Sequence, residues 1–235
     1  MWSAGFAYCI DKKGYTELLD VFRAWEPELD VRDPTLLDLQ SYIDRCVSGG
    51  GPTERRSALL MLAKKPELVG YLFSTLKDPA WFSELEAAGY FNSSYNPEVI
   101  QVLDGTRTSY QAIGWPALRY LENISSEVDN QSAVKIISIL RSVTSDAISR
   151  NIDNWRTWWS LATVLSRLPL EVIEDSDVEM IRVWFSGKFD ADMVCHELGK
   201  QLMPRLLDSQ TPSHWGLALS LAKELSALRS LGVQP

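Results

Sequence analysis

Residues 33–51, DPTLLDLQSYIDRCVSGGG, contain the pattern that decides the fold of this chain. Asp33 is a favourable N-cap residue. Pro34 is tolerated in the first turn of a helix because its missing N–H has no intrahelical partner to lose. Apolar side chains then follow at a helical spacing, and three consecutive glycines interrupt the pattern at 49–51. The segment therefore predicts one short amphipathic helix that ends at a glycine turn.

The same kind of helix start signal recurs along most of the chain. Proline occupies the expected helix starts at Pro34, Pro52, Pro66, Pro79, Pro97, Pro116 and Pro212. Most of these prolines precede roughly ten to twenty residues with apolar side chains at helical spacing, and no run with a period of two residues is convincing as a strand. We expect an all-α protein of about eleven or twelve short helices, in which short loops make neighbouring helices antiparallel.

Single residues indicate where several of these helices begin, end or bend. Asp78-Pro79 is expected to open one helix and Gly89 to end it, and either Asp129 or Asn130 to cap another. Pro204 is expected to kink or shorten a late helix. The expected apolar stripes are Leu59, Leu62 and Ala63 in the helix at 53–64, and Ala218, Leu221, Leu225 and Leu228 in the last helix.

Antiparallel helix pairs that pack on their sequential neighbours form an α-solenoid. We predict a right-handed α-α superhelix of HEAT or armadillo character, with degenerate repeats because no fixed-period motif is present. A closed helical bundle is the alternative, and the number of helices disfavours it. The array is expected to span residues 14–235, beginning with a helix after Gly14 and following an N-terminal arm at 1–13. Residues 92–114 have a weak helical signal and are expected to form a loop-rich break.

Composition limits the class of protein. The 235 residues are 46% hydrophobic and 23% charged, with a formal net charge of −8, which is typical of a soluble globular protein. An acidic chain is poorly suited to phosphate neutralisation, so nucleic acid is a disfavoured partner. No stretch approaches the roughly 20 apolar residues that a membrane-spanning helix needs, and the N-terminus is a poor signal peptide. Three cysteines without a CxxC pair fit a reducing, cytoplasmic location.

Three motifs resemble reactive or ligand-binding sites, but each lacks a required residue. Gly49–Gly51 precede a helix, yet a phosphate-binding loop needs a lysine followed by Ser or Thr at the helix start. Cys195-His196-Glu197 lacks the second histidine of a zinc-protease helix, since Lys200 occupies that position. The acidic run at 171–179 lacks the glycine of a calcium loop, so we expect its carboxylates to cap a helix. We therefore expect no catalytic residue, no cofactor and no metal site, and a protein that is not an enzyme.

Nine tryptophans distinguish this chain from an ordinary helical protein. Trp155, Trp158 and Trp159 follow the i, i+3, i+4 spacing that places side chains on one side of a helix. Aromatic rings stack nucleobases in some proteins, usually within a basic groove. The expected use here is core packing between helix layers, and a tryptophan left exposed would suit a protein-binding hot spot.

Two segments, DPAWF at 78–82 with GYF at 89–91 and WPALRYL at 115–121, occur together before a helix that ends near 168–169. This arrangement resembles a helical-repeat region of large bacterial multidomain proteins, several of them thought to act in phage defence. The resemblance covers about residues 55–210 and marks an architecture, with no recognisable effector domain. It implies a scaffold or sensor region whose enzymatic domain lies elsewhere, and it is compatible with a chain excised from a longer polypeptide.

We therefore expect a non-catalytic scaffold that binds a protein partner or another domain of the same polypeptide, through a surface that the sequence does not define. The residues expected to form the packing beside 92–114 are Trp81, Phe82, Phe91, Trp115, Tyr120 and Leu121. The alternative is a nucleic-acid-binding helical repeat with a basic groove. That alternative requires six arginines to share one surface: Arg55, Arg56, Arg119, Arg141, Arg150 and Arg156.

Overall fold

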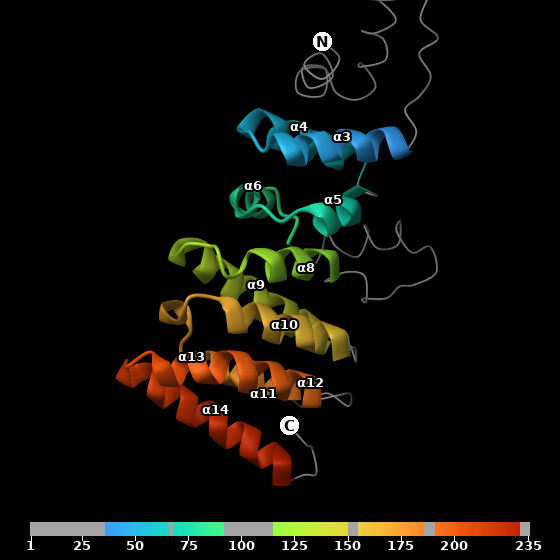
Figure 1. Ribbon diagram of the computed structural model, residues 1–235. Helices are drawn as coiled ribbons and strands as arrows, with labels where there is room; N and C mark the ends of the chain where they lie inside the picture. Colours follow the sequence, from blue (N-terminus) through green and yellow to red (C-terminus); the bar gives the residue numbers. More distant parts are fainter. Residues whose placement is uncertain (1–35, 66–67, 92–114, 150–154, 186–190, 231–235) are drawn as a thin grey trace, which may run out of the picture.

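The computed structural model describes residues 36–65, 68–91, 115–149, 155–185 and 191–230, which form helices joined by turns. No β-strand occurs within these ranges, and the expected all-α class is confirmed. The helices lie in successive layers in chain order, from α3 and α4 to α14 (Figure 1). Three expected features, the arm at 1–13, the helix after Gly14 and the break at 92–114, lie outside the described residues.

The first described helix follows the prediction from the quoted stretch. α3 (Leu36–Gly49) buries Leu39, Ile43 and Cys46, which lie at the expected helical spacing. Gly50 follows with φ of 62°, a left-handed conformation that glycine adopts at little cost. Its backbone N–H donates to the carbonyl of Cys46 at 3.1 Å, so the glycine turn ends the helix as expected.

The buried face of the second helix differs from the prediction. α4 (Pro52–Lys64) starts at its proline, but the expected inward stripe of Leu59, Leu62 and Ala63 is only partly correct. Met61 and Leu62 are buried, whereas Leu59 is half-buried and Ala63 is exposed. Methionine has more apolar surface to remove from water than alanine, so the helix turns the methionine toward its neighbours.

The next helix pair is short, and it begins and ends at the predicted residues. It consists of α5 (Val69–Thr75), the 3₁₀ turn η2 (Pro79–Trp81) and α6 (Phe82–Ala87). Asp78 Oδ1 accepts the N–H of Ala80 at 2.9 Å, which is the predicted N-cap before Pro79. Gly89, with φ of 79°, follows the end of α6 as predicted.

Two longer helix pairs form the middle of the chain. They are α8 (Trp115–Ile124) with α9 (Asn130–Ser149), and α10 (Trp155–Arg167) with α11 (Asp177–Phe185), the latter two joined through the 3₁₀ turn η3 (Leu170–Val172). Asp129 Oδ1 accepts the N–H of Ser132 at 2.7 Å and caps α9, as predicted. Over residues 157–166 of α10 every side chain is buried except the half-buried Trp159. This helix therefore lies at the centre of the described structure.

A wide helical turn precedes the last helices. α12 (Ala191–Glu197) continues into the π-helical turn η4 (Leu198–Leu202) and then α13 (Met203–Asp208), and α14 (Pro212–Ser230) follows. Pro204 lies in the first turn of α13. Because proline donates no N–H and its ring clashes with the carbonyl four residues earlier, the preceding turn widens. The proline thus changes the helix at the position where a kink or interruption was expected.

The helices form two rows, and successive helices of the chain alternate between them. Row A consists of α3, α5, α8, α10 and the α12–α13 segment, and row B of α4, α6, α9, α11 and α14. Within row A, contacts join α3 to α5, α5 to α8, α8 to α10 and α10 to α12. Within row B, contacts join α4 to α6, α9 to α11 and α11 to α14. These contacts therefore join helices that are two elements apart in the chain.

Ion pairs join the consecutive helices of row B. They are Arg55–Glu84 (α4 to α6), Glu86–Lys135 (α6 to α9), Arg141–Asp177 (α9 to α11) and Arg182–Glu224 (α11 to α14), each with an N···O distance of 2.6 or 2.7 Å. The more exposed of these pairs, Glu86–Lys135 and Arg182–Glu224, contribute little to stability. The four pairs instead fix the register between helices, because each pair joins one helix to a particular turn of the next helix in the row.

Side-chain donors join the consecutive helices of row A. They are Tyr71 Oη to the Asp44 carboxylate (α5 to α3), Asn123 Nδ2 to Leu76 O (α8 to α5), Arg167 Nη1 to Glu122 O (α10 to α8) and Arg205 Nη2 to Leu168 O (α13 to α10). The last three donors reach carbonyl groups at the C-terminal end of the preceding row A helix. The last turn of a helix has no following turn to donate backbone N–H groups, and the next helix in the row supplies a side-chain donor there.

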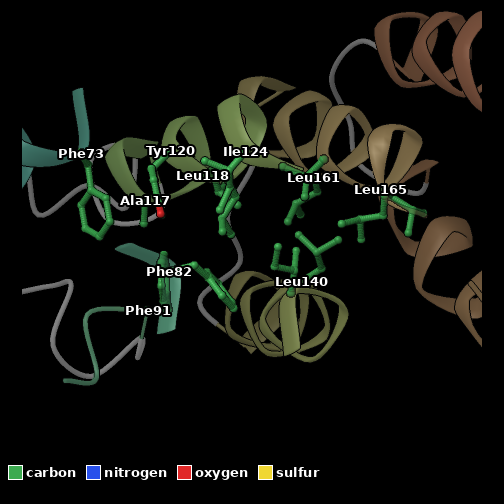
Figure 2. Close-up of a cluster of buried hydrophobic side chains, with 14 of the residues drawn as sticks. Phe73, Phe82, Phe91, Ala117, Leu118, Tyr120, Ile124, Leu140, Leu161 and Leu165 are labelled. Atoms are coloured by element: carbon green, nitrogen blue, oxygen red, sulfur yellow. The ribbon is translucent and has the colours of Figure 1, made fainter. Parts of the chain in front are cut away.

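The core between the rows is continuous. Figure 2 shows Phe73, Phe82 and Phe91 gathered beside Tyr120 of α8, and Leu140 of α9 facing α10. The ring centroids of Phe73 and Phe91 lie 5.7 Å apart, and those of Phe82 and Phe91 lie 5.5 Å apart. Each fully buried ring of this kind stabilises the fold by about 1.5–3 kcal/mol.

Candidate interaction surface

α14 carries apolar side chains on two faces. Its inner face buries Leu217, Ala218 and Leu221 where α14 packs against α11 and α13. Trp215 and Leu219 lie on the opposite, outer face and are exposed. A surface helix is normally apolar on one stripe only, so the outer face requires a separate explanation.

Three exposed apolar side chains gather at this end of the molecule. Trp215 and Leu219 are one turn apart on α14, and Trp215 Nε1 donates a hydrogen bond to the carbonyl of Leu207 at 3.2 Å. The exposed fractions are 55% for Leu207, 50% for Trp215 and 59% for Leu219. We call Leu207, Trp215 and Leu219 the terminal patch. It lies on the layer that closes the C-terminal end of the described stack (Figure 1).

The turn between α13 and α14 sets the position of the patch. Gln210 has φ of 55°, a left-handed conformation that is uncommon for a residue other than glycine. Ser209 Oγ donates to the carbonyl of Leu206 at 2.9 Å and lies 2.8 Å from Nδ1 of the buried His214. Since the serine hydrogen is used on Leu206, the imidazole Nδ1–H is the donor in the second bond. The pair therefore ties α14 to α13 and leaves no activated hydroxyl for catalysis.

An ion pair between Arg182 and Glu224 joins α11 to α14. Arg182 of α11 donates to both carboxylate oxygens of Glu224, at 2.6 and 3.1 Å, and to Glu179 one turn earlier at 2.7 Å. The hydrogen bond from Arg182 holds the pKa of Glu224 below its usual value. These bonds orient α14 against α11.

The terminal patch can contribute apolar contact area to a complex. Its side chains are about half exposed, so covering each of them would contribute about 1 kcal/mol. Tryptophan is also the residue most often found at the energetic centre of protein interfaces. Other exposed large apolar residues, Leu37, Val134, Ile148 and Met193, are on different helices or far apart. Val134 and Ile148, for example, are separated by about 21 Å along α9.

The residues expected to pack beside 92–114 belong to the core. Five of them are buried: Trp81, Phe82, Phe91, Tyr120 and Leu121. The side chain of Trp115 lies outside the described residues. Tyr120 Oη donates to the carbonyl of Asp78 at 3.0 Å, which joins α8 to the turn before α6. These residues are therefore structural, and none contributes to the terminal patch.

The arginines required for a basic groove are divided between the two rows. Arg55 and Arg141 lie in row B and are bound to Glu84 and Asp177, whereas Arg119 is exposed on α8 in row A. Arg56 is exposed on α4. Arg150 and the side chain of Arg156 lie outside the described residues. Of the four described arginines of this set, three therefore lie in row B and one lies in row A.

The fold separates or pairs the residues of the motifs that resembled reactive sites. Cys195 is buried, whereas His196 next to it is exposed, so α12 directs them to different surroundings. In the acidic run, Asp177 is fully buried, and its carboxylate accepts the N–H of Glu174 at 2.9 Å as well as Arg141. Asp177 is the first residue of α11, so its bond with Glu174 closes the turn before the helix and is not the N-cap bond that was expected. The ion pair with α9 is an addition that sequence reasoning missed.

Tryptophan exposure followed the expected division only in part. Trp158 is buried and Trp159 is half-buried, as expected for core residues, and the side chain of Trp155 lies outside the described residues. Among the tryptophans whose side chains the structure describes, Trp215 is exposed, and sequence reasoning did not identify it. The signal was present in the sequence, because Trp215 and Leu219 fall outside the predicted stripe of Ala218, Leu221, Leu225 and Leu228.

Within the described ranges no group of three or more His, Cys, Asp or Glu residues is placed to hold a metal ion. None of the helices found there is long and apolar enough to span a bilayer. Comparison with known proteins gives no significant match to a family model, to a curated protein or to a solved structure. The terminal patch and the packing of the two rows are therefore the features of the described structure that bear on function.

Proposed function

We propose that this chain is a non-catalytic scaffold that binds a protein partner through the terminal patch. One observation carries the proposal: three large apolar side chains gather, half exposed, on the last helix pair and are held together by the Trp215–Leu207 bond. Exposed apolar clusters on a polar surface are typical of protein-binding sites. The partner is a separate protein or another domain of a longer polypeptide.

The same proposal includes a right-handed α-solenoid of HEAT or armadillo character. It is supported by the contacts within each row, because a helix pair in a solenoid packs only on its neighbours. It is also supported by the row A bonds to helix C-termini, whose partners are separated by 47, 45 and 37 residues. The first two separations fall within the length of HEAT and armadillo repeats, which is about 40–47 residues, and the third is slightly shorter.

We also propose a biological setting, a bacterial cytoplasmic protein of the multidomain kind associated with phage defence. Its support is the resemblance of the segments at 78–91 and 115–121 to such helical-repeat regions. Cys46 and Cys195 are buried and are not part of a disulfide, which fits a reducing compartment. Nucleic acid remains the alternative partner, and the ion pairs of Arg55 and Arg141 with carboxylates weigh against it.

A comparison of matched surface variants tests the binding proposal. Leu219→Glu places a charge in the terminal patch, and Val134→Glu makes the same change at a residue of α9 that is 58% exposed. The tagged chain and both variants are each expressed in the same cells together with an untagged wild-type copy, and the captured proteins, the untagged copy included, are quantified by mass spectrometry. We expect Leu219→Glu to lose a partner that the wild type and Val134→Glu retain. Equal capture by all three, with unchanged circular dichroism, would contradict the proposal.

A further inference from the structure

We infer that the terminal patch binds a second copy of this chain, with the two α14 helices antiparallel about a two-fold axis at Leu219. The inference rests on the proposed function, because it names the partner of the same patch. The outer face of α14 consists of exposed residues at a spacing of three and four: Pro212, Trp215, Gly216, Leu219, Ala222, Lys223 and Ser226. That spacing is the one found along the seam between two packed helices.

This face is complementary to itself only when the helices run in opposite directions. In an antiparallel pair centred on Leu219, each residue before the centre faces the residue equally far after it in the partner. Trp215 then lies opposite the partner's Lys223, where the ammonium group can rest on the indole face. A parallel pair would place lysine against lysine, and the two like charges would repel.

Gly216 supplies an observation independent of the exposed apolar surface. It lies inside α14, where glycine lowers helix stability relative to alanine. A Cβ built on Gly216 meets nothing within 4 Å, so contacts inside this chain do not account for the missing side chain. In the antiparallel pair Gly216 faces the partner's Ala222. Two small residues at facing positions allow the helix backbones to approach closely.

The expected complex is weak and symmetric. A seam formed by one helix from each copy, with Leu207 at each end, is smaller than a standard protein interface. We therefore expect a dissociation constant in the micromolar range. Both copies use the same residues, as a two-fold interface requires, so the complex closes as a dimer and does not extend into a filament.

Sedimentation equilibrium of the purified full chain from about 1 to about 200 µM tests the inference. We expect a reversible monomer–dimer equilibrium for the wild type and for Val134→Glu. Leu219→Glu should weaken association at least tenfold. Gly216→Gln should do the same while raising the melting temperature of the monomer, because glutamine favours the helix but blocks close approach. Improved folding together with lost association would separate the interface effect from damage to the fold.

A residue exchange tests the antiparallel arrangement. Trp215→Lys alone places two lysines opposite each other, and Lys223→Trp alone removes the cation, so each should weaken the dimer. The double variant Trp215→Lys/Lys223→Trp restores one ring and one cation at each end of the seam. We expect it to associate more tightly than Trp215→Lys. A double variant no tighter than that single variant would contradict the antiparallel pairing.

The outcomes separate this inference from the proposed function. A wild-type chain that stays monomeric over the whole concentration range overturns self-association. If Leu219→Glu still loses a captured protein from cells in that case, the patch binds a different protein and the scaffold proposal stands. If a dimer forms but the dimers of Leu219→Glu and Val134→Glu have the same dissociation constant, the second copy binds elsewhere and the inference is wrong.

Discussion

Trp184 Nε1 donates a hydrogen bond of 2.9 Å to Thr144 Oγ1, and this bond joins α11 to α9 inside the core. Both side chains are buried, and the threonine hydroxyl in turn donates to the carbonyl of Leu140 at 2.7 Å. The indole N–H therefore has a protein partner where water cannot replace it. Hydrogen bonds of this kind contribute to stability mainly through the cost of leaving one partner unsatisfied.

Thr144→Val tests that cost. Valine has nearly the same shape as threonine but accepts no hydrogen bond, so the indole N–H would stay buried without a partner. We expect the free energy of unfolding to fall by about 1–3 kcal/mol, measured by urea titration. Thr163→Val is the matched control, because Thr163 Oγ1 is buried and has no hydrogen-bond partner. That control should be neutral or stabilising, and an equal loss in both variants would contradict the explanation.

Arg141→Met tests the ion pair between α9 and α11. The Asp177 carboxylate is fully buried and accepts from Arg141 Nε at 3.0 Å and Nη2 at 2.7 Å. Removing the guanidinium leaves that carboxylate with the Glu174 N–H alone. We expect a loss of about 1–3 kcal/mol, near the lower value because Arg141 is half exposed and water can enter.

A second substitution checks whether the buried charge is the cause. Asp177→Asn in the Arg141→Met background removes the charge and should recover part of the stability, as measured in a double-mutant cycle. Arg182→Met removes an arginine from an exposed row B pair and should cost less than Arg141→Met. A larger loss from Arg182→Met would contradict the distinction between the two pairs.

Tyr120→Phe should change the stability of the protein in alkali. Burial raises the pKa of Tyr120 far above its usual value, and the nearby Asp78 and Glu84 carboxylates raise it further. The folded protein therefore keeps the phenolic proton at a pH where the unfolded chain loses it. The contribution of Tyr120 to stability is fully present below about pH 10 and is lost as the pH rises from there toward the folded pKa.

The measurement is the urea midpoint of the wild type and Tyr120→Phe between about pH 8 and pH 11. Phenylalanine does not ionise, so the variant should lose less stability than the wild type over the alkaline part of this range. At pH 8 the variant should be less stable by about 1 kcal/mol, because Asp78 loses the hydrogen bond at its carbonyl. Parallel pH profiles for the two proteins would show that Tyr120 does not titrate as described.

Two glycines are expected to respond to alanine in opposite ways. Gly89 has φ of 79°, which costs an alanine about 1–2 kcal/mol, so Gly89→Ala should lower the melting temperature. Gly216 lies inside α14 with open space around it, so Gly216→Ala should raise the stability of the monomer by up to about 1 kcal/mol. Thermal melts at low protein concentration compare the two variants, and a stabilised Gly89→Ala would contradict the first prediction.

Helix boundaries were predictable because they depend on residues close together in the chain. The caps at Asp78 and Asp129 and the glycine after α6 follow from groups a few residues apart, whose chemistry is the same in any fold. The buried stripe of α4 was only partly correct, since the pattern of Leu59, Leu62 and Ala63 did not indicate which side of the helix would meet its neighbours.

The sequence alone therefore determined the all-α class and the positions at which helices begin and end, through local hydrogen bonding and helical spacing. Tertiary structure decided the partners that lie tens of residues apart, such as Arg141 with Asp177 and Arg167 with the carbonyl of Glu122. It also decided which apolar residues stay exposed. Leu219 and Leu221 have the same side chain and lie on the same helix. Because α11 and α13 pack on one side of that helix, Leu221 is buried and Leu219 stays at the surface.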